Sequence, residues 1–166
     1  MRDAETVVAG SEIVVECPGL THHHTGDTPV PLRLRRRIAD GTWIFEVGTP
    51  VAQVPLLAGT AREQDVRDLA LGILDVLETD GGEPDFRLYD DGYTEVRATV
   101  GYGPELYLAL EATFDLDRDR AGTDPNGSPR YANPFGWCFA ELGGIPVAEP
   151  EALGGFARAL LAALDG

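Results

Sequence analysis

The chain contains no lysine, and all 13 of its basic residues are arginine. The absence of lysine excludes Schiff-base chemistry, cofactors held as a lysine aldimine and phosphate-binding loops of the G-x-x-x-x-G-K-[ST] type. Serine is almost as scarce, because Ser11 and Ser128 are the only two and neither lies in a G-x-S-x-G sequence. Several large classes of enzyme are therefore excluded, and no motif assigns a catalytic residue.

Cysteines and long hydrophobic runs are also few. Cys17 and Cys138 cannot form a disulfide framework or a four-thiolate zinc site. No apolar run approaches the roughly 20 residues that a membrane span needs, and no signal-peptide hydrophobic region follows Met1. The 166 residues, of which 43% are hydrophobic and 25% charged, are therefore expected to form a single cytoplasmic domain over 1–166, with no membrane contact.

Negative charge dominates the chain and is concentrated in its middle. The formal net charge is −15. Residues 62–124 contain 17 acids against six arginines, a net charge of −11, whereas 1–61 and 125–166 each carry only −2. Such a segment repels nucleic-acid phosphates and accelerates the encounter with a basic protein. We therefore expect a basic protein partner and no nucleic acid.

Hydrophobic periodicity predicts the elements of secondary structure. Strands are expected at 6–9, 11–16, 32–38, 42–47, 86–89, 94–100 and 105–116, with an edge strand or extended connection at 51–57 and a short strand or plug at 135–139. Helices are expected at about 61–79 and 150–164, the first beginning with a capping box formed by Thr60 and Glu63. Loops are expected at 18–31 and 117–134.

This order of elements predicts an α+β fold. Strands, a helix, further strands and a second helix suit a mostly antiparallel sheet with both amphipathic helices packed on one face. The alternation of apolar and polar residues along the strands leaves the other face in solvent.

All three histidines lie together in the first predicted loop. His22, His23 and His24 precede Asp27, and imidazole with a carboxylate is a ligand set for zinc, nickel, copper or iron. Consecutive side chains on an extended loop alternate in direction, so at most two of these histidines reach one ion. A divalent transition metal is therefore one alternative, and a solvated loop without any cofactor is the favoured one.

Arginines alternate with apolar residues on the strand predicted at 32–38. Arg33, Arg35 and Arg37 share the face opposite Leu32 and Leu34, so their guanidinium groups could hold a phosphate, a carboxylate or an acidic segment. The alternative is cross-strand pairing with acids such as Glu46.

Candidate partner-binding residues lie in the acidic middle of the chain. Tyr107 is on the face opposite Leu106 and Leu108, and is therefore expected at the surface or beneath a partner. The acids placed with it, in predicted turns and loops, are Asp90, Asp91, Asp117 and Asp119.

The element order over residues 42–114 is similar to that of small uncharacterised actinobacterial domains, and the exclusive use of arginine also indicates a high-GC bacterial source. The resemblance implies an immunity or accessory role. We therefore expect a non-enzymatic protein-binding module, as an immunity, antitoxin-like or accessory subunit, that presents an acidic surface to a basic partner as a monomer or homodimer. Two alternatives stay open: a metal-dependent enzyme or metal-binding domain using His22–His24, and a small-ligand-binding domain with Arg36 or Arg97 as the anion contact.

Overall fold

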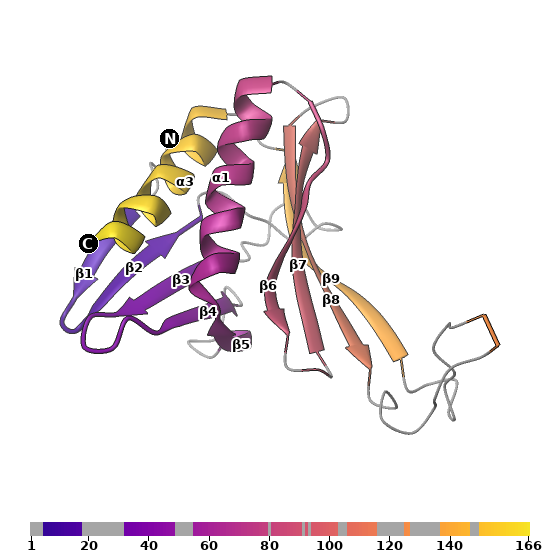
Figure 1. The fold of residues 1–166 in the computed structure, drawn as a ribbon, viewed down its shortest axis with the longest axis horizontal. Helices are drawn as coiled ribbons and strands as arrows, with labels where there is room; N and C mark the ends of the chain where they lie inside the picture. Colours follow the sequence, from indigo (N-terminus) through magenta and orange to yellow (C-terminus); the bar gives the residue numbers. More distant parts are fainter. Residues whose placement is uncertain are drawn as a thin grey trace.

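A computed structural model describes residues 5–17, 32–48, 55–79, 81–90, 92, 94–102, 106–115, 125–126, 137–146 and 150–166. Two antiparallel sheets and two helices form the molecule (Figure 1). The first sheet contains β1 (Glu5–Ala9), β2 (Glu12–Glu16), β3 (Leu32–Arg37), β4 (Trp43–Gly48) and β5 (Pro55–Ala61), in that order. The second contains β6 (Asp85–Asp90), β7 (Thr94–Tyr102), β8 (Leu106–Asp115) and β9 (Trp137–Pro146). The predicted α+β class is confirmed.

The helices α1 (Glu63–Thr79) and α3 (Pro150–Asp165) lie side by side and run antiparallel. Arg67 near the start of α1 reaches Asp165 at the end of α3, and Gly154 near the start of α3 lies beside Leu77 near the end of α1. The pair covers one face of the first sheet, and α1 also contacts β6 and β7 of the second (Figure 1). The strands thus form two sheets where the sequence predicts one, and α1 packs between them.

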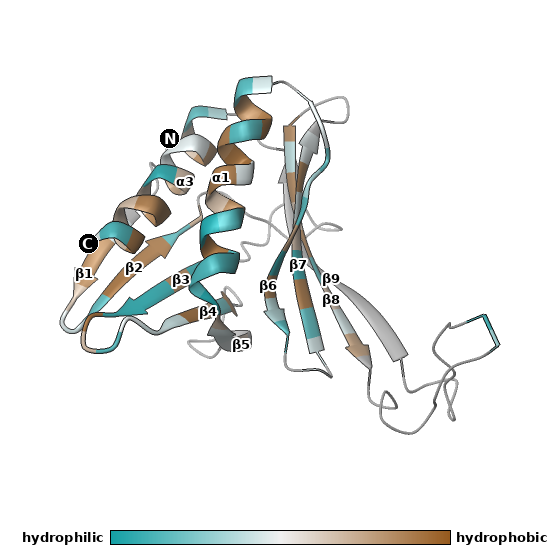
Figure 2. Cartoon of the chain, in the orientation of Figure 1, coloured by the Kyte–Doolittle hydropathy of each residue, from teal (hydrophilic) through white to brown (hydrophobic). Residues whose placement is uncertain are grey.

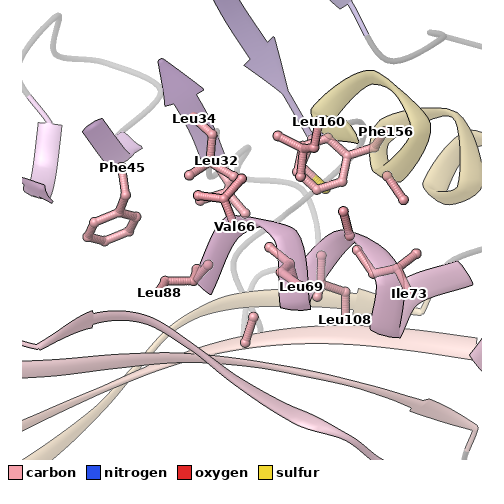
Figure 3. Packing of buried hydrophobic residues seen from close by; sticks show 14 of the residues in the cluster. Leu32, Leu34, Phe45, Val66, Leu69, Ile73, Leu88, Leu108, Phe156 and Leu160 are labelled. Carbon is pink, nitrogen blue, oxygen red and sulfur yellow. The ribbon is translucent and has the colours of Figure 1, made fainter. Parts of the chain in front are cut away.

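A single hydrophobic cluster includes residues from both sheets and both helices. In Figure 3 Val66 of α1 lies beside Leu32 and Leu34 of β3, while Leu69 and Ile73 lie over Leu108 of β8. All six side chains are essentially inaccessible to solvent. The wide apolar stripe of α1 follows from this position, since a helix between two sheets must bury side chains on two sides.

The structure corrects two element boundaries. The predicted capping box is wrong, because Thr60 belongs to β5 and pairs with Ile44 of β4. Ala61 continues that ladder and is buried, so the chain stays extended, and α1 begins only at Glu63. At residues 135–139 the prediction is too short: β9 extends to Pro146 and forms nine residue pairs with β8, with one irregularity in the register.

Among the helices of the described residues, none has the length and apolar character that a membrane span requires.

Candidate functional site

A polar cleft of about 320 Å³ lies where the start of α1 meets β6 and β7. Its walls carry three arginines, three aspartates and one aromatic ring: Arg62, Asp65, Asp68, Asp85, Phe86, Arg87 and Arg97. Arg97 is one of the two anion contacts considered from the sequence. The other, Arg36, does not line this cleft, because it lies in the row of β3 that pairs with Ile13 and Trp43.

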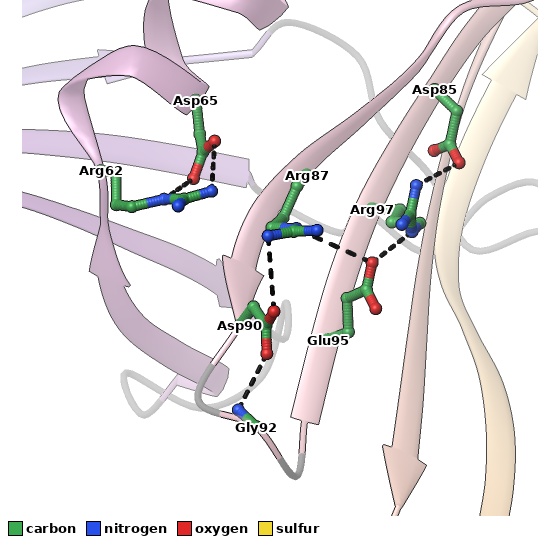
Figure 4. Close-up of polar contacts among 8 residues, drawn as sticks. All are labelled: Arg62, Asp65, Asp85, Arg87, Asp90, Gly92, Glu95 and Arg97. Carbon is green, nitrogen blue, oxygen red and sulfur yellow. Dashed lines mark hydrogen bonds and ion pairs between the residues drawn. The ribbon is translucent and has the colours of Figure 1, made fainter. Parts of the chain in front are cut away.

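Each arginine of the cleft is already paired with a carboxylate (Figure 4). Arg62 donates two hydrogen bonds to Asp65, at 2.7 and 2.9 Å. Arg97 donates to Asp85 at 2.7 Å and also pairs with Glu95, and Arg87 lies 3.5 Å from Asp90. An incoming anion would therefore have to compete with carboxylates of the chain itself.

The pKa values of two of these arginines agree with this pairing. The hydrogen bonds and the charge of Asp65 raise the pKa of Arg62 above its usual value. Partial burial lowers the pKa of Arg97, but the opposing effects of Asp85 and Glu95 are larger in sum and raise it. Both guanidinium groups are held firmly in the charged form.

An acidic stripe continues from the cleft along the exposed side of α1. It consists of Asp68, Leu71, Asp75 and Glu78, whose spacing of three and four residues places them on one side of a helix. The side chain of Leu71 is 50% exposed in the middle of this stripe. We call these four residues the acidic face of α1.

Little positive charge balances the acidic face. The helix carries five acids and one arginine, Arg67, which pairs with Glu63 and Asp165 at its N-terminal end. Asp68 accepts a hydrogen bond from Gln64. In the described part of the chain no ion pair reaches Asp75 or Glu78. This surface was not predicted, although the sequence shows Asp68, Leu71, Asp75 and Glu78 at helical spacings of three, four and three residues.

Tyr107 lies half-buried on β8, on the face opposite the buried Leu106 and Leu108, as expected. Its hydroxyl donates a hydrogen bond to Glu83 at 3.0 Å. Partial burial, this hydrogen bond and the charge of Glu83 raise the pKa of the Tyr107 hydroxyl. Tyr107 is therefore fixed by a carboxylate of the chain itself.

Asp90 is the other described member of the predicted partner-binding set. Its carboxylate pairs with Arg87 and accepts a hydrogen bond from the Gly92 amide at 2.8 Å. Asp91, Asp117 and Asp119 lie outside the described residues, as does most of the loop predicted at 117–134.

Arg33, Arg35 and Arg37 of β3 lie on the face of the first sheet that α1 and α3 do not cover, whereas Arg36 lies on the covered face. Arg33 pairs with Glu16 at 2.6 Å, and Arg37 with Asp40 at 3.1 Å. Arg35 lies between Glu12 and Glu46, at 2.9 and 2.6 Å. Partial burial alone would lower the pKa of Arg35, but these two glutamates raise it. The predicted stripe is thus present, with a carboxylate beside each guanidinium group.

The histidine loop falls outside the described residues, and so do His22, His23, His24 and Asp27. Cys17, which precedes the loop, is buried, and its burial together with the charge of Glu16 raises the pKa of the thiol. Among the residues that the structure describes, no group of three or more histidine, cysteine, aspartate or glutamate side chains is placed to hold a metal ion.

No protein-family model, no curated protein and no solved structure matches this chain.

Proposed function

We propose that this chain is a non-enzymatic protein-binding module, of the immunity, antitoxin-like or accessory type, that presents an acidic surface to a basic partner. The observation that carries the proposal is the acidic face of α1, where Leu71 is half-exposed between Asp68, Asp75 and Glu78. A solvated leucine framed by carboxylates suits a partner that supplies arginine or lysine side chains around an apolar contact.

Negative charge is concentrated on α1 and the second sheet, which supports a contact between a basic partner and this side of the molecule. The strands of the first sheet contain four glutamates and four arginines and are therefore neutral. The second sheet contains six acids and two arginines, and α1 contains five acids and one arginine. A basic partner would be steered toward α1 and the second sheet, and the steering would weaken with added salt.

The pairing of the arginines in the cleft is also compatible with a basic partner. Arg62, Arg87 and Arg97 are each neutralised by a carboxylate, so they offer no free positive charge that would repel a basic partner. Asp68 belongs both to the cleft and to the acidic face, which makes the two surfaces continuous. The proposed contact therefore extends from the cleft along α1.

The test is capture of the partner from the native lysate with two charge variants of the purified chain. One variant carries Asp68→Asn, Asp75→Asn and Glu78→Gln. The matched control carries Asp40→Asn, Glu151→Gln and Asp165→Asn, which removes the same number of exposed charges elsewhere. We expect the wild-type chain and the control to retain one basic protein, and the α1 variant to bind it at least about tenfold more weakly at about 150 mM salt.

Three outcomes would contradict the proposal. Equal binding of the basic protein by both variants would show that the acidic face of α1 is not the contact. A captured partner that is acidic or neutral would remove the electrostatic argument. Recovery of no partner by the wild-type chain would count against a binding module.

A further inference from the structure

Among the described residues, β1 forms the outer edge of the first sheet. β1 pairs with β2 alone among the described strands, in a regular register from Glu5 opposite Glu16 to Ala9 opposite Glu12. The side chains of Val7 and Val8 are 43% and 66% exposed. β1 contains no proline, no basic residue and no bulge, which are the usual means by which an edge strand avoids further pairing.

Most of β1 is made of apolar residues (Figure 2), and the pairing with β2 places one exposed valine on each face of the sheet. Val8 is opposite Ile13, whose row continues through Arg36 to the buried Trp43, so Val8 lies on the helix-covered side. Val7 is opposite Val14 and lies on the other side. Helix α3 packs over β2 yet leaves Val8 largely exposed. A strand added beside β1 would therefore bury apolar surface on both faces of the sheet.

The charge distribution favours this edge over the other surfaces of the chain for contact with a second copy. Two copies of a chain with a net charge of −15 repel each other over most of their surfaces. The first sheet is the exception, since its strands contain equal numbers of glutamates and arginines. A second copy therefore meets the least repulsion at the apolar edge of this neutral sheet.

We propose that two copies of this chain associate through antiparallel pairing of their β1 strands. A twofold axis at Val7 places the two Val7 residues opposite each other, Thr6 opposite Val8, and Glu5 opposite Ala9. No like charges face each other in this register. The two Val7 side chains form a cross-strand apolar pair, and each Val8 faces a Thr6 of the other copy. The pairing is isologous and closes at a dimer, and it joins two five-stranded sheets into one of ten strands.

The dimer leaves the acidic face of α1 free. Figure 1 shows α3 on the β1 side of the molecule and α1 beyond it, toward the second sheet. Each copy therefore keeps its acidic face exposed, and the dimer presents two such faces. Because the dimer needs only the purified chain, its test is independent of the proposed basic partner.

The mass of the purified chain in solution tests the dimer. Sedimentation equilibrium at about 1 to 100 µM should show the mass rising from 17.8 kDa toward twice that value. We expect Val7→Lys and Val8→Lys each to raise the dimer dissociation constant at least tenfold. The matched control is Ile38→Lys, since Ile38 is 55% exposed and follows β3, with β2 between it and the open edge of β1. Circular dichroism verifies that each variant is folded.

Hydrogen exchange of the wild-type chain supplies a measurement without any substitution. The β1 amides should exchange more slowly at concentrations where the dimer forms, while the β5 amides keep the same rate. A wild-type chain that stays monomeric at about 100 µM would overturn the proposal. So would a dimer that Ile38→Lys weakens as much as the β1 variants do, or one whose β1 amides gain no protection.

Discussion

The ring of Tyr89 on β6 stacks on the ring of Phe45 on β4, with a centroid distance of 6.0 Å and 28° between the ring planes. Tyr89 also lies so close to Gly59 of β5 that no Cβ fits there. These contacts bring together the two sheets, whose described strands share no hydrogen-bonded ladder. The two sheets are therefore joined by aromatic packing where β5 and β6 meet.

A second contact between an aromatic ring and a glycine, that of Phe86 with Gly72, predicts the effect of a substitution at this glycine. The ring of Phe86 on β6 occupies the space over Gly72 of α1 that a Cβ would fill. Gly72→Ala should lower the free energy of unfolding by about 1–3 kcal/mol, because Phe86 must move out of its place. This loss should exceed the gain of about 1 kcal/mol that alanine normally brings to a helix. Urea denaturation measures the difference.

The control for this prediction is Gly155→Ala on α3. A Cβ at Gly155 meets no atom within 4 Å, so only the helical preference of alanine acts there. We expect stabilisation of about 0.5–1 kcal/mol. If both substitutions stabilise the chain to the same degree, the ring of Phe86 does not pack against Gly72 in solution.

Two leucines of α1 allow the same substitution to be compared inside and outside the core. Leu69 is fully buried, whereas Leu71 is 50% exposed. Leu69→Ala should cost about 2–5 kcal/mol through lost burial and the cavity that remains. Leu71→Ala should change stability by less than about 0.5 kcal/mol. If Leu71 is the apolar contact of the basic partner, this stable variant should nevertheless bind that partner more weakly. Thermal unfolding and binding measured on the same samples separate the two effects.

The hydrogen bond between Tyr107 and Glu83 predicts a pH dependence. The pKa of Tyr107 is raised above the usual 10.0, so the folded chain holds this proton more tightly than the unfolded chain does. The resulting stability is complete below the usual pKa and is lost as the pH rises through the folded value. Stability should therefore fall at alkaline pH, and Tyr107→Phe should remove part of that fall.

Titration of the tyrosinate absorbance provides the check. Glu83→Gln removes the carboxylate and should bring the pKa of Tyr107 back toward its usual value. If Glu83→Gln leaves the alkaline titration of Tyr107 unchanged, the hydrogen bond does not form in solution.

Much of the fold could be predicted from the sequence, because burial on one side leaves a periodic pattern. Leu106, Leu108 and Leu110 alternate along β8 and are all buried, and the apolar stripe of α1 is buried at Val66, Leu69 and Ile73. The start of α1 was harder to predict, because Thr60 and Glu63 satisfy a local capping rule that the β4–β5 ladder overrides. Gly143 and Gly144 interrupt any alternation in β9, so its length was not visible.

The candidate surfaces also include parts that the sequence predicts and parts that depend on the tertiary structure. The common face of Arg33, Arg35 and Arg37 follows from strand geometry. The sequence also predicts Glu46, on the next strand, as a partner of these arginines. The partners Glu12 and Glu16 depend on the pairing of β2 with β3, a register that the sequence alone does not specify. The cleft is less predictable still, because Arg62 and Arg97 are 35 residues apart and meet only when α1 packs beside β6 and β7.

The position of α3 has a consequence for folding during synthesis on the ribosome. Helix α3 belongs to residues 150–165, yet it packs on β2 at residues 12–16 and on α1. During synthesis, the first sheet and α1 emerge from the ribosome well before the helix that completes their core. Until α3 arrives, Val15 and part of α1 lack the cover that they have in the finished molecule. The core beside the first sheet therefore stays incomplete in the nascent chain until α3 has emerged.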